Sequence, residues 1–511
     1  MRRRVIAMFW AATMAWLLGA ALTSLANGAA LGFGLSSYPP TLNPHVSGGT
    51  AARTVKSTIY EGLMSYDADG EVRLQLAESV EMIDPTTYRF RLRTGVRFHG
   101  GQPFTSGDVV YTFERILDPA SGAYLSGTLQ VIESIEAPDD HTVVFKLKEP
   151  FAPFLEVLAQ PEASIVSKAW METNPDLNTQ VNGTGPFRLA QRIPGVQIRV
   201  ERNPDYYEPG LPKVDAINFI AYSDPDARLA ALQTGQIQIM EYVEWRQIPR
   251  IQADPSLVLD LEPGVFQVLS INVNEGPLAD PRVRQAIAYA VDREEIALAC
   301  FEGYAVPLYG ALITEGHWAY SEDLANYYAY DPEKARQLLA EAGYPDGFPV
   351  TILATSAYST HYCPAEVVQA QLGRIGIDVS VELVDWPTRV ERRSDWSYEI
   401  ASDGLAGDYL DPDFYFRYFH SAAPAYAKPP HFTDAEVDRL LEAGRSMTDR
   451  EQRKQIYHDL EKRLLELSPW IFLVKREQPY AMRAEVTGFE QLPSFLTAFS
   501  GVTLKHTEIG Q

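Results

Sequence analysis

The residues best suited to chemistry are three aspartates in the segment 404–413, which reads GLAGDYLDPD. Asp408 lies between Gly407 and Tyr409, and two further aspartates follow it in the same segment. A carboxylate such as Asp408 can hold an ammonium group through a charge-assisted hydrogen bond, which water screens poorly in an enclosed site. The alternative is structural, because aspartate also caps turns and helix starts. The segment therefore indicates either a site for an amine or a turn.

Paired acids such as Asp411 and Asp413 also occur in hydrolases, but the chain lacks the other parts of such a site. It contains no GxSxG nucleophile motif and no HExxH zinc motif. Its nine histidines are scattered and its two cysteines form no CxxC pair, so we expect no metal centre and no cofactor. An oxidising compartment would permit a disulfide between Cys300 and Cys363, but the sequence does not show whether they come within bonding range.

The first residues predict export from the cytoplasm. Three arginines at positions 2–4 precede an uncharged run over residues 5–25, and Ser24 and Ala26 supply small residues for cleavage. The sequence therefore predicts a cleavable signal peptide over residues 1–26 and a periplasmic protein. An uncleaved membrane anchor is the alternative, because the apolar run is long enough to cross a bilayer. No cysteine lies near the cleavage point, which argues against a lipoprotein.

Composition disfavours two classes of partner. The chain has 44 basic and 67 acidic residues, a net charge of −23. So acidic a protein repels nucleic acid and anionic lipid head groups. Beyond the signal peptide about 485 residues remain, which is room for two or three domains of ordinary size.

The stretch 76–115 shows how the chain builds its elements. Apolar residues recur with period two from Tyr88 to Leu92, with arginines between them, which indicates a half-buried strand. Glycine-rich turns follow. Thr105 and Asp108 then have the spacing of a capping box before an apolar helix.

Later segments repeat the alternation of strand and helix. The character of the chain changes near Pro263–Gly264, and residues 268–273 read as a strand. Asp280 can cap a helix whose apolar spacing extends to Val291. Thr448 with Glu451 predicts another capping box. Strands alternating with helices throughout predict an α/β architecture.

The order of residues in 76–115 resembles the hallmark segment of the peptide- and nickel-binding family of extracytoplasmic solute-binding proteins, family 5, which serve ABC importers. Two further landmarks of the same family are GTGPF at 183–187 and RNPDYY at 202–207. Gly100 and Gly107 depart from the family pattern, and both lie where the chain is expected to turn.

The resemblance implies a two-lobed periplasmic binding protein fold of α/β class (type II, cluster C), with an extra subdomain inserted in lobe one. Placed by these landmarks, lobe one spans 27–262 and 483–511, the inserted subdomain spans 59–185, and lobe two spans 263–482. In such a protein the ligand lies in the cleft between the lobes and contacts both, so it favours the closed state over the open one.

The resemblance also implies which side chains face that cleft. In peptide-binding relatives, the aspartate at the place of Asp408 holds the α-amino group of the ligand. The other expected ligand-binding residues are Trp386, Trp245, Tyr358, His361 and Phe266. Core packing is the alternative for the tryptophans, a surface position is the alternative for His361, and Phe266 could face either way.

Two departures weaken an ordinary peptide assignment. Leu405 occupies the place of a family tryptophan, which removes an aromatic wall. Dipeptide-binding relatives also carry an arginine for the ligand carboxylate in the loop expected at 351–363, and that segment contains none. Histidine cannot reproduce the bidentate fork of arginine. Either another arginine serves, such as Arg389, or the ligand has no free carboxylate at that end.

The resemblance therefore implies a monomeric periplasmic binding protein, not an enzyme, that captures a short peptide or a peptide-like, amine-bearing molecule. It would deliver this solute to the permease subunits of an ABC importer in the inner membrane. The alternatives are a non-peptide ligand such as an opine, a glycoside or a nickel chelate, and a chemosensory accessory role. A secreted hydrolase is the remote alternative.

Overall fold

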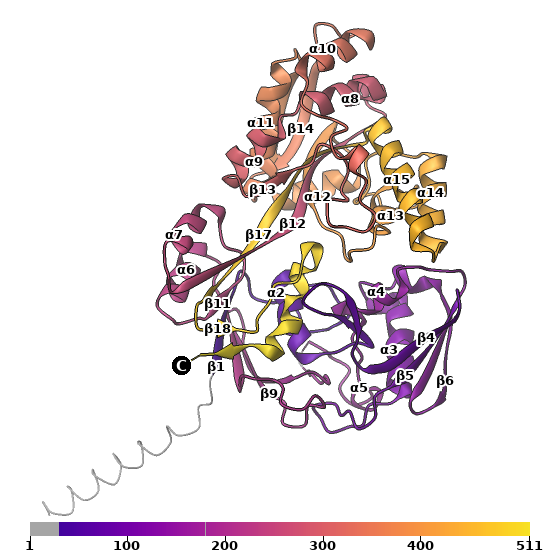
Figure 1. The fold of residues 1–511 in the computed structure, drawn as a ribbon, viewed down its shortest axis with the longest axis vertical. Helices are drawn as coiled ribbons and strands as arrows, with labels where there is room; N and C mark the ends of the chain where they lie inside the picture. The colour runs from indigo at the N-terminus through magenta and orange to yellow at the C-terminus, as the bar shows by residue number, and fades with distance from the viewer. Residues whose placement is uncertain (1–29, 179, 511) are drawn as a thin grey trace, which may run out of the picture.

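Two lobes are joined by two long antiparallel strands, β12 (Leu257–Ile271) and β17 (Trp470–Arg483), which run from one lobe into the other (Figure 1). The computed structural model describes residues 30–178 and 180–510. The expected signal peptide, residues 1–26, lies outside the described residues. No helix in the described part of the chain is long and apolar enough to cross a membrane.

The connecting strand β12 differs from its prediction. A strand was expected only from Val268, after a change of character near Pro263–Gly264, but β12 continues through all of these positions. Its pairing with β17 is interrupted between Pro263 and Phe266 and again between Gln267 and Val268. Such bulges bend a strand and increase its twist, which allows one strand to serve both lobes.

One sheet of 11 strands passes through both lobes in the order β15-β14-β16-β12-β17-β11-β1-β10-β9-β8, with β13 paired to β17. In the first lobe its strands are β1 (Ala30–Leu35), β8 (Phe187–Ile193), β9 (Gln197–Arg202), β10 (Ala216–Ala221) and β11 (Ile239–Met240). In the second they are β13 (Ala305–Pro307), β14 (Pro349–Thr355), β15 (Asp378–Val384) and β16 (Ile400–Leu405). Parallel pairs such as β14 with β15 confirm the predicted α/β class.

The first lobe carries an additional antiparallel sheet, which includes two strands from the stretch 76–115 that resembles the family. Its order is β4-β5-β7-β6, with helix α3 (Ser106–Leu117) beside it. The strands are β4 (Ala77–Asp84), β5 (Thr87–Leu92), β6 (Ile132–Asp139) and β7 (Thr142–Leu147). The period-two face of β5 is buried, and the capping box of Thr105 and Asp108 is present, so both predictions are confirmed.

The GTGPF landmark has a steric reason. A Cβ atom on Gly183 would lie 2.0 Å from the carbonyl oxygen of Ile59, and one on Gly185 would lie 2.6 Å from the same atom. The Gly185 N–H donates to that oxygen at 2.9 Å. Only glycine permits two chain segments to approach this closely.

Second-lobe helices cover the sheet, and they confirm one of the two caps predicted for them. They include α8 (Pro281–Ala290), α9 (Arg293–Phe301), α10 (Pro332–Glu341), α11 (Ser359–Gly373), α14 (Ala435–Ser446) and α15 (Arg450–Leu467). Asp280 caps α8 as expected, although the helix ends before Val291. The capping box predicted at Thr448 is wrong, because the side chain of Asp449 accepts the N–H of Gln452 instead.

The two cysteines form a disulfide, which answers the question that the sequence left open. Cys300 in α9 is bonded to Cys363 in α11, with 5.7 Å between their Cα atoms and a separation of 63 positions in sequence. The bond joins two helices of the second lobe (Figure 1). It therefore stabilises that lobe internally and leaves motion between the lobes unrestricted.

The lobes are in direct contact. Buried apolar residues of the inserted subdomain and of the second lobe belong to one continuous cluster, which includes Leu496 and Phe499 of the long 3-10 segment η7 (Ser494–His506). Ala152 also donates its N–H to the carbonyl oxygen of Arg445 at 2.8 Å. The two halves are thus packed against each other on this side of the cleft.

Candidate functional site

Asp408 lies at the contact between the lobes, in the turn between β16 and α13 (Phe414–Phe419). Its Oδ1 atom accepts a hydrogen bond from the hydroxyl of Tyr124 at 2.6 Å, and its Oδ2 atom pairs with Arg417 at 2.5 Å. Arg53, from helix α2 (Gly49–Ile59), places Nη2 3.9 Å from Oδ1. We call these four residues the Asp408 bridge. Tyr124 and Arg53 come from the first lobe, so the carboxylate connects the two halves.

The bridge decides between the two readings of Asp408. Its side chain accepts no backbone N–H from a described residue, so it does not act as a cap. Its three polar neighbours are the guanidinium groups of Arg53 and Arg417 and the hydroxyl of Tyr124. An ionised carboxylate can accept about four hydrogen bonds, so Asp408 retains capacity for a ligand donor. Arg53 is itself paired with Glu162 at 2.7 Å.

The neighbouring aspartates serve the fold. Asp411 forms a two-pronged pair with Arg453, at 2.6 and 2.5 Å, and Asp413 forms another with Arg445, at 2.8 Å for both contacts. Each carboxylate is buried and neutralised by its arginine. Neither is free to act as an acid or a base, which agrees with a binding protein.

Tyr358, His361 and Trp386 form a second group. The ring of Trp386, the first residue of α12 (Trp386–Ser394), lies 5.1 Å from the Tyr358 ring and 5.8 Å from the His361 ring. The expected loop at 351–363 is wrong in part: β14 extends to Thr355 and α11 starts at Ser359. Tyr358 therefore caps a helix and is half exposed, whereas His361 lies buried in the first helical turn.

His361 is a neutral donor in this group. Its Nδ1 atom lies 2.9 Å from the carbonyl oxygen of Ser402, so Nδ1 carries the proton. Burial, followed by the positive charge of Arg389, lowers the pKa of His361 to about 4. The predicted surface alternative for this histidine does not hold, because its side chain is buried.

Two arginines of α12 share one carboxylate beside these rings. Arg389 and Arg393 both pair with Asp403 of β16, Arg393 at 3.2 Å. Arg393 also donates to the Ser270 hydroxyl at 3.0 Å. The guanidinium of Arg389 lies 5.0 Å from the centre of the Trp386 ring. Arg389, which the sequence suggested as a carboxylate ligand, thus faces the aromatic group but already has one ion-pair partner.

Trp245 joins this group through an arginine that sequence reasoning missed. Trp245 lies in the 3-10 turn η4 (Trp245–Gln247) and donates its indole N–H to the carbonyl oxygen of Glu477 at 3.2 Å. The guanidinium of Arg476, in β17, lies 5.7 Å from the centre of its ring. Arg476 also contributes to the lowered pKa of His361. The only signal in the sequence was a charged triplet directly after the apolar run of β17.

We call the residues around these rings the hinge cluster, because β12 and β17 pass beside it. Its members are Trp245, Tyr358, His361, Trp386, Arg389, Arg393, Asp403 and Arg476. Three of the six residues expected at the ligand site therefore meet in one group, Trp245 is linked to it only through the charge of Arg476, and Asp408 belongs to the Asp408 bridge.

Phe266 lies elsewhere. It is only 1% exposed and packs against Phe414, Tyr418, Trp470 and Phe495 at ring distances between 5.6 and 6.5 Å. The structure thus places it in the core below the site rather than on a ligand-facing wall.

A cavity of about 1560 Å³ lies between the lobes. The inserted subdomain contributes Met64, Leu74, Val80 and Met82 to its wall, and the second lobe contributes Leu312, Trp318 and Phe414. None of the six expected ligand-binding residues lines it. The cavity adjoins the segment that contains Asp408, because Leu410 and Asp411 form part of its wall.

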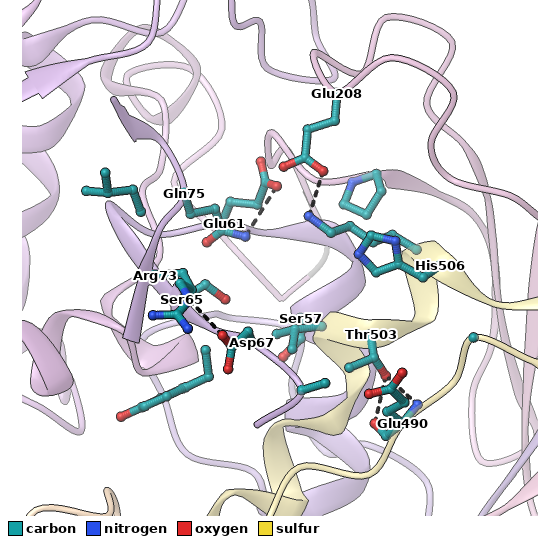
Figure 2. Close-up of a pocket in the computed structure, with 17 residues that line it drawn as sticks. Ser57, Glu61, Ser65, Asp67, Arg73, Gln75, Glu208, Glu490, Thr503 and His506 are labelled. Atoms are coloured by element: carbon teal, nitrogen blue, oxygen red, sulfur yellow. Dashed lines mark hydrogen bonds and ion pairs between the residues drawn. The ribbon is translucent and has the colours of Figure 1, made fainter. Parts of the chain in front are cut away.

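A smaller pocket of about 390 Å³ lies within the first lobe (Figure 2). Four of its charged groups already form pairs: Asp67 with Arg73 at 2.6 Å, and Glu208 with Lys505 at 2.8 Å. Burial raises the pKa of Glu61 to about 7, and hydrogen bonds from neighbouring side chains, including the Tyr206 hydroxyl at 2.7 Å, support this carboxyl. Its polar groups thus serve each other, and we assign it no ligand.

Comparison with known proteins places this geometry in a family. The model of "Bacterial extracellular solute-binding proteins, family 5 Middle" matches residues 71–427. The glutathione-binding protein GsiB of Pectobacterium atrosepticum is 31% identical over 481 residues, which cover 91% of this chain and 92% of GsiB. GsiB of Escherichia coli K12 is 31% identical over 477 residues, with 90% and 91% coverage.

Solved structures agree. The binding protein AgaA of A. tumefaciens R10, in complex with agropinic acid, is 39% identical with a TM-score of 0.83, covering 94% of this chain and 99% of AgaA. DppA from Helicobacter pylori, in complex with the peptide STSA, is 27% identical with a TM-score of 0.80, at 95% and 98% coverage. The predicted family and the two-lobed α/β fold are confirmed. The chain belongs to family 5 of the bacterial extracellular solute-binding proteins, which bind solutes for ABC importers and are not enzymes.

Proposed function

We propose that this protein captures a zwitterionic solute derived from amino acids, of peptide-like or opine-like kind, in the closed cleft between its lobes. As a family member, it is the solute-binding component of an ABC importer. The observation that carries the ligand assignment is the placement of Asp408, a partly enclosed carboxylate at the lobe contact with remaining hydrogen-bonding capacity. An ammonium group held there would touch both lobes, which is the condition for a ligand to favour closure.

The relatives support a small polar ligand. Similar proteins bind glutathione, agropinic acid and the peptide STSA, as their names state. Aromatic rings beside polar groups, as in the hinge cluster, are typical of sites that bury most of a small ligand. Asp408, Trp386, Trp245, Tyr358 and His361 are thus our proposed ligand-binding residues.

The remaining features of the proposal follow from the importer role. Lobe one would comprise 27–262 and 483–511, with 59–185 inserted, and lobe two 263–482, with the hinge where β12 and β17 cross. The protein would be exported through the cleavable signal at 1–26, remain a monomer without a lipid anchor in the periplasm, and deliver its solute to the permease subunits.

A direct test combines thermal shift with mass spectrometry. Glutathione and agropinic acid are added separately to the purified full-length mature chain, and solute released by mild denaturation is identified. We expect at least one acid to raise the melting temperature, because a ligand that binds only the folded state stabilises it. Absence of a shift with either probe, together with absence of any released solute, would contradict the proposal.

A further inference from the structure

Arg476 differs from the other arginines near the cleft. Among the described residues it forms no ion pair, and its Nε atom has no hydrogen-bond partner. The side chain is half-buried, and its one close partner is the face of Trp245. By contrast, Arg53, Arg389 and Arg417 each pair with a carboxylate.

The nearest acidic side chain does not neutralise Arg476. Glu244 acts on it electrostatically but lies beyond ion-pair distance. Glu244 is instead the first residue of the turn that starts η4, where its backbone N–H donates to the side-chain oxygen of Gln247 at 3.3 Å. Glu477 follows Arg476 directly, and successive side chains of a strand point to opposite faces. The guanidinium of Arg476 therefore retains its capacity for an anion.

The balance of charge around the cleft points the same way. The Asp408 bridge and the hinge cluster contain five guanidinium groups and two carboxylates, and Glu162 beside the bridge adds a third, although the whole chain has a net charge of −23. The three carboxylates are Glu162, Asp403 and Asp408. A half-buried charge without a partner is costly, so such an excess is typical of a site that awaits an anion.

We propose that Arg476 binds a carboxylate of the transported solute, with the Arg389 side of the hinge cluster as the second wall of this subsite. The inference rests on the proposed function and adds the anionic end of the ligand to it. The flat fork of a guanidinium matches a carboxylate with two parallel hydrogen bonds. Trp245 and Trp386, each under one of these guanidinium groups, hold the two cations in place.

In this proposal, Arg476 takes the role of the arginine that is missing from the segment 351–363. Arg476 reaches the site from β17, a strand that connects the lobes, rather than from the start of α11. A carboxylate bound there would contact the connecting strand, while the amine end of the same solute would contact Asp408. Both ends of the ligand would then be fixed at positions that change when the lobes move.

The test compares three variants by isothermal titration calorimetry, with agropinic acid and glutathione as probes. Arg476→Gln removes the charge, and Arg476→Lys keeps the charge but loses the fork. Arg392→Gln is the matched control, because Arg392 lies on the same helix as Arg389 but pairs outward with Glu382 at 2.6 Å. We expect Arg476→Gln to lower the affinity for whichever acid wild type binds by about tenfold or more. Arg476→Lys should lower this affinity less, and the control should bind as wild type does.

A second readout separates binding from folding. Since Arg476 has no ion-pair partner, Arg476→Gln should leave the melting temperature of the ligand-free protein unchanged or raise it. A lowered melting temperature together with unchanged affinity would assign Arg476 a structural role and overturn the inference. Equal affinity of wild type and Arg476→Gln for a bound acid would overturn it while leaving the proposed function intact. If wild type binds neither probe and releases no solute, both fail.

Discussion

Substitution of Asp408 by asparagine tests how the cleft recognises an amine. Asparagine keeps the shape of the side chain but removes the negative charge that Arg417 and a ligand ammonium would share. A hydrogen bond to a charged group contributes about 1.5–3 kcal/mol. The side chain of Asp408 is 19% exposed and that of Arg417 is 47% exposed, so solvent screening favours the lower end. We therefore expect a loss of about 1.5 kcal/mol, or about tenfold in affinity.

The assay is a double comparison by calorimetry. N-acetylglutathione lacks the positive charge of the glutathione amine and carries an acetyl group in its place, and each compound is titrated into wild type and Asp408→Asn, so that the bulk of the acetyl group is the same in both proteins. Wild type should prefer free glutathione, and the variant should lose that preference. Asp215→Asn serves as a control, because Asp215 forms an exposed ion pair with Arg202 at 3.0 Å, in the first lobe.

A companion variant isolates the contact between the lobes. Tyr124→Phe removes the hydroxyl that donates to Asp408 and accepts from Arg417 at 2.8 Å, but it leaves the carboxylate in place. It should shift small-angle scattering of the ligand-free protein toward the open form without removing the preference for a free amine. If Asp408→Asn keeps the wild-type preference for glutathione, the carboxylate does not contact the amine and the reasoning is refuted.

Three further predictions concern stability and selectivity. Replacing both Cys300 and Cys363 by serine should lower the unfolding free energy by about 4 kcal/mol in denaturant titrations, given the 63-residue separation; a loss below about 1 kcal/mol would argue against the bond. Burial and then the charge of Asp411 raise the pKa of Glu156 from 4.5 to about 8, so the folded state holds a proton that the unfolded chain releases. The unfolding free energy should therefore fall as pH rises from about 4.5 to about 8, and Glu156→Gln should reduce this slope; an identical slope in the variant would contradict the assignment. The dipeptide Met-Leu should bind poorly, because the carboxylate ligand proposed here, Arg476, lies on the connecting strand β17 and not at the start of α11, where dipeptide-binding relatives carry their arginine; a strong thermal shift at micromolar concentration would contradict this.

Local patterns were sufficient for much of the architecture. The period-two face of β5, the capping box of Thr105 and the cap at Asp280 depend on side chains a few residues apart, and all three are confirmed. Predictions were wrong where two neighbouring residues could each cap a helix, or where the boundary between a strand and a helix had to be placed. Asp449 rather than Thr448 caps α15, and the segment assigned to a loop before α11 divides between a strand and a helix.

The candidate site depended on the resemblance, which named residues without their partners. Tyr358, His361 and Trp386 meet as a group, but the sequence alone contained no reason why these rings should be near one another. Phe266 was misjudged because an aromatic residue at a lobe boundary fits either a wall or a core. Its ring contacts, not its position in the chain, assign it to the core.

By itself the sequence determined the α/β class and the family, because these follow from local periodicity and from motifs of fixed spacing. Only the tertiary structure decided which charges have partners. Asp408 meets Tyr124 across 284 positions of sequence, and Arg476 remains without a carboxylate although acidic residues flank its region of the chain. Such pairing depends on how distant segments pack and which way each side chain points, and spacing along a chain contains neither.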